Sequence, residues 1–362
     1  MRDWWRDWRI RLISNPKFRQ KISRFWPFSR VARRHARRLF DISAGFVYSQ
    51  TLMACVELDW FERLAAGPVS LSVLTDECVL GRSGVERLVA AAAALDLLEL
   101  RAGEYVALGQ LGAALIGDKG VVAMAAHHHL LYADLANPLA LLGSGESRTA
   151  LGDFWGYAKS DPSGLTAERV RDYSQLMADS QPMVAEQVLA AFDFKGAQRV
   201  LDVGGGTGAF VSAVGAAHPH IDFEVFDLPG VAELASVPTT LGLVRHGGNF
   251  CTDPLPTGAD IITLIRIIHD HDDDVVDQLL TNIRQSLSAD GVLLIAEPLA
   301  QAPGAETVGD VYFGFYLLAM GSGKARTVPE INQLLQRNGF APVRQHPTPV
   351  PLICSVLTTH PV

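Results

Sequence analysis

The chain has 362 residues, of which 48% are hydrophobic and 19% are charged, so it can build two domains and is too apolar for a disordered protein. No uninterrupted apolar run reaches the ~18–20 residues that cross a bilayer, and arginines interrupt every apolar stretch near the N-terminus, so we expect no secretory signal. The four cysteines are scattered without a C-x-x-C pair, which predicts reduced thiols in the cytoplasm.

Residues 1–40 form a basic, tryptophan-rich arm on an otherwise acidic chain. The arm carries a net charge of +11, and the remaining residues carry −19. Trp4, Trp5, Trp8 and Leu12 would share one face of a helix. Indole rings flanked by arginines suit an anionic lipid surface, so we expect peripheral membrane binding. Packing of the arm on a partner subunit stays open, whereas nucleic acid is disfavoured because the rest of the chain is acidic.

Residues 41–120 are predicted to form three helices followed by a hairpin. The helices are expected at 46–64, 70–78 and 83–100, with Ser83 as N-cap of the third and Glu86 three residues on. A glycine-containing turn at 102–104 then joins two short strands. This order is typical of a winged helix, so a DNA-binding repressor must be considered. The third helix has no basic or amide side chain between 89 and 95 to contact base edges, which favours a dimerisation domain.

Residues 121–195 are predicted to be a helical linker that contributes to a substrate pocket. Three histidines stand at 127–129, and adjacent residues cannot all point to one side of a helix, so we expect no metal site there. His128 and Tyr132 are candidates for lining a substrate tunnel, and satisfied, partly buried histidines are an equal alternative. Tyr173 and Met177 are further candidates for the tunnel wall. Ser180 could reach the carboxylate of a cofactor, or it could face solvent.

Residues 196–362 alternate strand and helix, which predicts a doubly wound α/β fold with a parallel sheet. The first strand, 199–203, runs into the glycine loop 204–208 and then a helix. Glycines allow the backbone to pass close to a ligand. The loop alone also satisfies the dinucleotide pattern G-x-G-x-x-A through Ala209, so by itself it leaves the cofactor open.

Polar side chains follow the next predicted strands at their carboxyl ends, where open α/β sheets bind ligands. Asp227 ends the second strand and could accept hydrogen bonds from both hydroxyls of a ribose. Asn249 and Phe250 follow the third strand and could bracket an adenine by hydrogen bonding and stacking. The fourth and fifth strands lead to the remaining candidates, which are Arg266, His269, Asp270 and Glu297.

These segments resemble the caffeate-type O-methyltransferase family. The resemblance is carried by residues 202–208, 226–229, 248–250, 269–270, 297 and 323–327, and it covers most of the chain. It implies a Rossmann-like catalytic domain preceded by a winged-helix-like dimerisation domain, S-adenosylmethionine as cofactor, and a homodimer. A finer pattern, in residues 39–41, 45–50, 127–135 and the arm, resembles the family members that methylate bacterial carotenoids.

The resemblance assigns roles to individual residues. His269 would be the catalytic base, with Glu297 as the main candidate to orient it and Asp270 as a weaker one. Two departures from the family matter: Asn249 replaces an aspartate, and Ala325 replaces a second carboxylate beside the histidine in plant members. Carried over from the family, Gly204, Asp227, Asn249, Phe250 and Arg266 would contact the cofactor. Apart from the resemblance, we add Asp202, Gly206, Leu228 and Ser180 as candidate cofactor contacts.

The sequence therefore predicts methyl transfer to a tertiary hydroxyl of an acyclic carotenoid, without a metal, by an enzyme on the cytoplasmic face of a photosynthetic inner membrane. One alternative is the same chemistry on a bacteriochlorophyll precursor, a quinone or a polyketide. A second is an inactive, membrane-associated cofactor-binding protein, because Ala325 could mark a lost active site.

Overall fold

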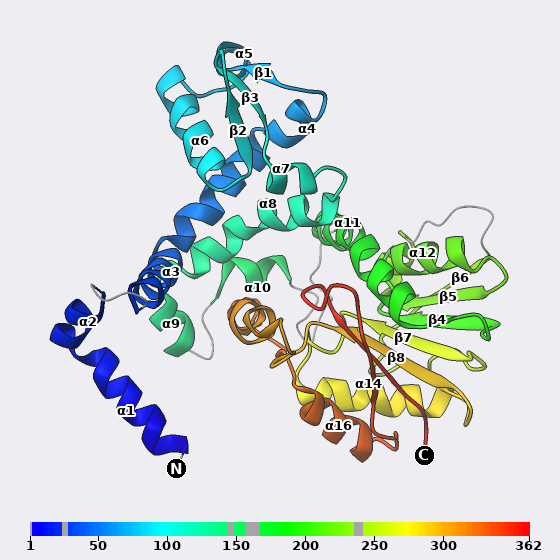
Figure 1. Cartoon of the computed structure of the whole chain (residues 1–362). Helices are drawn as coiled ribbons and strands as arrows, with labels where there is room; N and C mark the ends of the chain where they lie inside the picture. Colours follow the sequence, from blue (N-terminus) through cyan, green and yellow to red (C-terminus); the bar gives the residue numbers. More distant parts are fainter. Residues whose placement is uncertain (1, 24–27, 144–147, 156–166, 235–241) are drawn as a thin grey trace. The chain divides into compact units, whose positions relative to one another are not determined.

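Figure 1 shows the computed structural model of the whole chain. The structure describes all residues except 1, 24–27, 144–147, 156–166 and 235–241, and it describes only the backbone of residues 2, 23 and 167–173. The chain divides into two compact units, Met1–Ile116 and Gly117–Val362. Each unit is described by itself.

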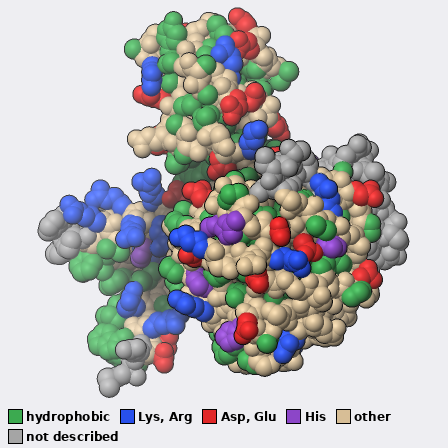
Figure 2. All heavy atoms as spheres, turned by 90° about the vertical axis from the view of Figure 1, so that its right-hand side faces the viewer, with side chains coloured by type: hydrophobic (Ala, Val, Ile, Leu, Met, Phe, Trp, Pro, Cys, Tyr) green, Lys and Arg blue, Asp and Glu red, His purple; other side chains and the backbone are tan. Residues whose placement is uncertain are grey.

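The arm of the first unit is helical. Helices α1 (Arg2–Ser14) and α2 (Pro16–Ser23) precede α3 (Phe28–Glu57), which runs through residue 40, the expected end of the arm. In Figure 2, basic and apolar side chains crowd this arm. By length and composition α3 meets the minimum for a membrane-crossing helix, although only 11% of its apolar window is buried. One such helix is weak evidence for a span, because apolar helices of soluble proteins pass the same test.

The rest of the first unit has the predicted order of helices followed by a hairpin. Its elements are α4 (Trp60–Ala65), β1 (Val69–Ser70), α5 (Leu71–Asp76), α6 (Arg82–Ala94), β2 (Leu98–Arg101), β3 (Tyr105–Leu108) and α7 (Gln110–Ala114). The strands form an antiparallel sheet in the order β1-β3-β2. Val85, Val89 and Ala92 of α6 lie in a core with Trp60 and Phe61, so the third helix buries its apolar face.

Several helix boundaries in this unit differ from the prediction. The helix expected at 46–64 is broken, because Asp59 adopts a left-handed backbone conformation that ends one helix and starts α4. The prediction of Ser83 as an N-cap is wrong, since Gly81 holds that position and Arg82 begins α6. Glu86 pairs with the Arg82 side chain at 2.8 Å. The helix ends at Ala94, and residues expected in its last turn form β2.

The second unit begins with the predicted helical region. Helices α8 (Lys119–Asp134), α9 (Pro138–Gly143), α10 (Ala150–Phe154) and α11 (Ala167–Ala191) precede the sheet. Residues of α8, α10 and α11 share an apolar cluster with the segment 312–320.

The second unit is built on a seven-stranded sheet in the order β6-β5-β4-β7-β8-β10-β9. Five strands are parallel: β4 (Arg199–Val203), β5 (Asp222–Asp227), β6 (Leu243–Gly247), β7 (Ile261–Ile265) and β8 (Val292–Glu297). The last two, β9 (Arg344–His346) and β10 (Ser355–Thr359), are antiparallel to their neighbours. The predicted doubly wound α/β fold is thus confirmed.

Helices cover both faces of this sheet (Figure 1). Helices α14 (Asp273–Ser286) and α16 (Val328–Arg337) pack on one face, and α11 and α12 (Ala209–Ala217) pack on the other. The remaining elements are α13 (Pro229–Ala232), a π-helix (Thr307–Phe313) and α15 (Gly314–Met320). The chain reverses its winding between β4 and β7, so the loops after these two strands flank the crevice where such sheets bind ligands.

Candidate active site

The loop after β7 carries a buried histidine–carboxylate pair. His269 Nδ1 is hydrogen-bonded to Oε2 of Glu297, a side chain at the end of β8 that is 1% exposed. The other oxygen, Oε1, accepts hydrogen bonds from the backbone N–H groups of Ile267 and Ile268, each at 2.8 Å. A carboxylate has no hydrogen to donate, so Nδ1 must carry a proton, and in the neutral imidazole Nε2 then holds the lone pair. The pair therefore presents a base at Nε2.

A second carboxylate lies on the other side of the imidazole. Oδ1 of Asp270 is 3.1 Å from His269 Nε2. Burial lowers the pKa of His269, but Asp270 and Glu297 together outweigh burial and raise the pKa above its ordinary value. The charged form of the imidazole is therefore stabilised from both nitrogens.

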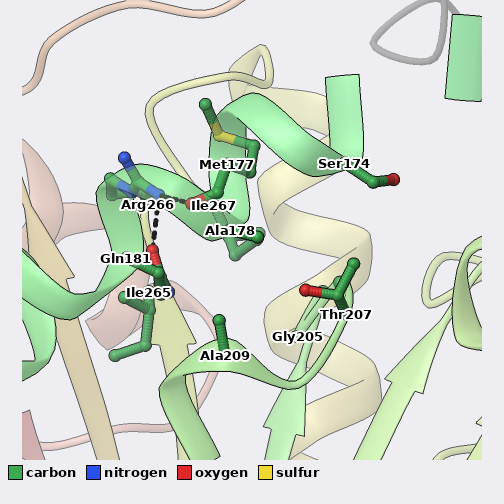
Figure 3. A pocket seen from close by; sticks show the side chains of 12 residues that line it. Ser174, Met177, Ala178, Gln181, Gly205, Thr207, Ala209, Ile265, Arg266 and Ile267 are labelled. Atoms are coloured by element: carbon green, nitrogen blue, oxygen red, sulfur yellow. Dashed lines mark hydrogen bonds between the residues drawn. The ribbon is translucent and has the colours of Figure 1, made fainter. Parts of the chain in front are cut away.

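An open cleft lies beside this histidine loop, between the glycine loop and α11 (Figure 3). It encloses about 420 Å³, including the solvent at its mouth. Met177 and Gln181 line it from α11, and Arg266 and Ile267 line it from the loop after β7. Of the predicted cofactor residues, the lining includes Gly204, Gly206 and Arg266.

The glycine loop is held close to the cleft by its backbone conformation. Gly204 has a φ of +71°, and a Cβ there would lie 2.4 Å from Ile267 Cδ1, so a side chain would be strained and would require Ile267 to shift. The Gly206 N–H donates to Asp227 Oδ2 at 2.8 Å, and the Leu228 N–H donates to Asp227 Oδ1 at 2.7 Å. Burial outweighs these bonds and raises the pKa of Asp227 to about 6. Each carboxylate oxygen keeps a lone pair for a hydroxyl donor.

Asp202 lies beneath the loop and outside the lining of the cleft. Its side chain is 1% exposed, and Oδ1 accepts a hydrogen bond from the Thr263 hydroxyl at 2.6 Å. Oδ2 has no hydrogen-bond partner, and a Cβ on Gly205 would lie 2.7 Å from it. Burial raises the pKa of Asp202 to about 7. An unsatisfied buried oxygen directly under a ligand loop suits a cationic ligand above it.

Arg266 reaches from the end of β7 to helix α11. Its backbone adopts a left-handed conformation with a φ of 58°, which is uncommon for a residue other than glycine. Its guanidinium donates to the Ser180 hydroxyl at 2.9 Å, to the Met177 carbonyl at 3.3 Å and to Gln181 Oε1. Ser180 is thus buried behind Arg266, which it helps to hold, and does not line the cleft.

Asn249 and Phe250 form a turn after β6. Oδ1 of Asn249 accepts from the Cys251 N–H at 2.9 Å, and the Asn249 N–H donates to Asp253 Oδ2 at 2.8 Å. The Phe250 ring lies edge-on to the His271 ring, with centroids 5.4 Å apart. Neither side chain is among the described residues that line the cleft.

An aromatic cluster borders the candidate base. The Phe313 ring lies 5.4 Å from the His269 ring, and Tyr312 packs against Phe313 at 5.1 Å. The Tyr312 hydroxyl is hydrogen-bonded to His128 Nε2 at 2.7 Å, and the Tyr132 ring lies 6.3 Å from the His128 ring. These rings come from α8 and the π-helix.

The three histidines of the run face different surroundings. His127 is buried and bonds to the Tyr316 hydroxyl at 3.0 Å, His128 bonds to Tyr312, and His129 is exposed. Burial lowers the pKa of His127 to about 4, so this residue is a satisfied, neutral core histidine. The side chain of Tyr173 lies outside the described residues.

Sequence reasoning missed several residues of this region. Gln181 holds Arg266, and Thr207 and Ile267 line the cleft, but none of them stands out by type or spacing. Tyr312 and Phe313 gave a weak signal as adjacent aromatics in an apolar helical segment. Ala325, where plant members have a carboxylate, packs with the apolar cluster beside them.

Comparisons with known proteins agree with this geometry. A family model described as an O-methyltransferase domain matches residues 143–341. The chain is 41% identical over 355 residues to demethylspheroidene O-methyltransferase of Cereibacter sphaeroides, covering 96% of this chain and 93% of the relative. It is 40% identical over 347 residues to the enzyme of the same name from Rhodobacter capsulatus, covering 96% of this chain and 88% of the relative.

The fold also matches solved structures. Human N-acetylserotonin methyltransferase, determined in complex with S-adenosylmethionine, superposes with a TM-score of 0.75 at 24% identity, covering 90% of this chain and 97% of that one. The likeness to that structure shows the fold. The chain belongs to the O-methyltransferase family and is a methyltransferase.

Proposed function

We propose that the enzyme methylates a tertiary hydroxyl of an acyclic carotenoid, with His269 as the general base. The substrate class is supported by the names of the two relatives, which share about two fifths of their residues with this chain over 96% of its length. The buried contact between His269 and Glu297 is the observation that carries the catalytic part, because it fixes the tautomer in which Nε2 can accept a proton.

We assign S-adenosylmethionine, which the human neighbour binds, as the cofactor. When bound, it would supply an electrophilic methyl group: the substrate oxygen would bond to the methyl carbon in line as the carbon–sulfur bond of the sulfonium breaks, and the sulfur would leave as a neutral thioether. His269 Nε2 takes the proton of the substrate hydroxyl as the new C–O bond forms. Glu297 fixes the tautomer, and Glu297 and Asp270 stabilise the resulting imidazolium. An aliphatic alcohol is less acidic than a phenol, so the proton leaves late. Alignment of the substrate oxygen with the methyl group and the sulfur supplies most of the rate enhancement, and the base adds a factor of ~10²–10⁴.

The residues present suit this cofactor. Gly204 and Gly206 let the loop approach it closely, and the lone pairs of Asp227 can accept from the ribose hydroxyls. We assign the adenine to Asn249 and Phe250, with Leu228 beside the ribose. Asp202, with its unpaired oxygen, acts from beneath the loop, and Ser180 acts through Arg266.

An apolar wall next to the base suits a long hydrophobic substrate. Met177 and Phe313 belong to the apolar cluster formed with α8, α10 and α15, and Phe313 touches the His269 ring. We place the substrate along Met177, His128 and Tyr132. His128 and Tyr312 add one hydrogen-bonding pair to this wall.

A bacteriochlorophyll precursor, a quinone or a polyketide would suit the same wall. The inactive alternative is disfavoured, since the His269–Glu297 pair forms although Ala325 replaces the second carboxylate. Incubation of the enzyme with methyl-labelled cofactor and hydroxylated acyclic carotenoids, tetrapyrroles, quinones or polyketides tests the substrate. We expect label in the carotenoid. Label in another class alone, or in none, would overturn the proposal.

We further propose that the arm binds an anionic membrane surface, from which the substrate enters. Trp4, Trp5 and Trp8 of α1 are 62%, 54% and 45% exposed, although apolar rings favour burial. Arg6 and Arg9 follow Trp5 and Trp8, Asp3 and Asp7 precede Trp4 and Trp8, and the arm as a whole carries a charge of +11. Such a helix lies in the interface between lipid and water on the cytoplasmic side.

We also propose a homodimer. Helix α3 exposes Leu39, Phe40, Ile42 and Phe46, each by more than 60%. A row of large apolar side chains on one long helix is a self-complementary surface for a symmetric dimer. Light scattering of the purified protein should give twice the chain mass of 39.2 kDa, and a monomer would contradict this.

A further inference from the structure

The segment 322–327, which contains the G-K-A-R-T motif, packs against the loop that carries the base. The Ser322 hydroxyl donates to the Asp270 carbonyl at 2.9 Å, and the Gly323 N–H donates to Asp272 Oδ1 at 2.9 Å. Gly323 has a φ of +78°, and a Cβ on it would lie 2.1 Å from the His269 carbonyl oxygen. The two backbones therefore touch at the residue that bears the base.

Arg326 makes the strongest contacts of this segment. Its side chain is 1% exposed, and its guanidinium donates to the Ile268 carbonyl and, at 2.8 Å, to the His271 carbonyl. Nε and Nη2 also bind Oδ1 of Asp273 at 2.9 and 2.7 Å. A single planar cation thus holds carbonyls on both sides of His269. The Asp273 carboxylate balances its buried charge.

The loop is held from the opposite side as well. Glu297 accepts the N–H groups of Ile267 and Ile268, whereas Arg326 binds the carbonyl of Ile268. Both hydrogen-bonding groups of Ile268 are therefore used, one towards β8 and one towards the segment 322–327. The backbone that leads into His269 cannot rotate without breaking one of these contacts.

We infer that Arg326 is a positioning residue for the catalytic base: its guanidinium fixes the backbone on both sides of His269, so that the imidazole meets Glu297 on one side and the substrate on the other. This inference rests on the proposed role of His269. Lysine cannot replace Arg326 in this role, because its single ammonium group cannot reach two carbonyls and a carboxylate in one plane.

The test compares Arg326→Lys with Gly323→Ala. Lysine keeps the buried charge, and the alanine leaves Arg326 in place but displaces the His269 carbonyl. We expect kcat to fall ~10²-fold in both variants, as for a shift of about 1 Å in a reacting group. KM and the affinity for S-adenosylhomocysteine, measured by calorimetry, should stay near those of the unchanged enzyme.

The matched control is Arg337→Lys. Arg337 of α16 pairs with Asp277 of α14, the helix that also carries Asp273, and lysine weakens this arginine–carboxylate pair. The kcat of this control should stay unchanged.

A second readout for Arg326→Lys and Gly323→Ala is the pH profile of kcat. Once the loop is loose, His269 loses part of its contact with Glu297 and Asp270, so the acid limb of the profile should move to lower pH. In Arg326→Ala, added methylguanidinium should restore part of kcat.

Unchanged kcat in Gly323→Ala and in a folded Arg326→Lys would overturn the inference. A loss of kcat without any shift in the acid limb of its pH profile would overturn it as well. If Arg326→Lys does not fold, the inference is tested by the kcat of Gly323→Ala and by the rescue of Arg326→Ala with methylguanidinium. The variant His269→Ala separates the claim that His269 is the base from the claim that Arg326 positions it. If it retains kcat, the proposed base is wrong. If it loses kcat while Arg326→Lys and Gly323→Ala do not, only the positioning role is wrong.

Discussion

Oδ1 of Asp270 lies 3.1 Å from Nε2 of His269, on the opposite side of the ring from the nitrogen that Glu297 binds. The imidazole therefore sits between two carboxylates, and its pKa is raised although burial alone would lower it. This arrangement stabilises the imidazolium that forms when the substrate loses its proton. Because the pKa of His269 is raised, its imidazole becomes neutral, and so able to act as a base, only at a higher pH.

The pH dependence of kcat should follow from this contact. The neutral imidazole is the active form, so kcat should rise with pH through the pKa of His269, above the ordinary ~6.5, and level off beyond it. Glu297→Gln removes one anionic partner, which should lower that pKa, move the acid limb to lower pH and reduce the plateau. Glu224→Gln, on β5 and paired with His246 of the edge strand β6, is the control. An acid limb that does not move would contradict the assigned pair.

Cofactor affinity should have its own pH dependence. Asp227 must be ionised to accept both ribose hydroxyls, and burial raises its pKa to about 6. The affinity for S-adenosylhomocysteine should therefore weaken as the pH falls below about 6. In Asp227→Asn it should be weaker throughout and lack this dependence. Calorimetry at several pH values checks this, and a flat profile for the unchanged enzyme would argue against the ribose assignment.

The glycine loop should not tolerate a side chain at its first position. Gly204→Ala places a Cβ 2.4 Å from Ile267 Cδ1 and forces an alanine into a left-handed conformation. We expect the variant to fold and to bind S-adenosylhomocysteine much more weakly. Gly230→Ala, at a position with open space around it, is the matched control. Equal affinities in the two variants would show that the loop does not approach the cofactor.

Membrane binding should depend on the arm. A chain without residues 1–27 loses α1 and α2 but keeps α3, which begins at Phe28. The full chain should float with vesicles rich in phosphatidylglycerol and less so at high salt, because salt screens the arginines. Replacing Trp4, Trp5 and Trp8 by alanine keeps the charge and should also weaken flotation. Equal flotation of the full and the truncated chain would refute the proposal.

The sequence predicts the catalytic domain well because its signals are local. β4 matches its predicted bounds, 199–203, residue for residue, because it ends where the glycine loop begins, and all of its residues after Arg199 are buried. His269 and Glu297 were found because the carboxyl ends of parallel strands meet at one edge of the sheet. A pattern of that kind needs no knowledge of side-chain packing.

Features that depend on tertiary contacts could not be predicted in this way. The break at Asp59 follows from the left-handed backbone conformation of this residue. Ser180 lies four residues from Leu176 on α11, and only the folded chain shows that it faces Arg266 and not the cleft. Arg326 stands 58 residues from Ile268, so its motif was visible but its partners were not.

The role of His269 is tested most directly by turnover of His269→Ala with methyl-labelled cofactor and a hydroxylated acyclic carotenoid. The account predicts a loss of ~10²–10⁴-fold in kcat, with the affinity for S-adenosylhomocysteine unchanged, because the imidazole acts on the proton and does not line the cofactor cleft. A variant that turns over at the rate of the unchanged enzyme would contradict it.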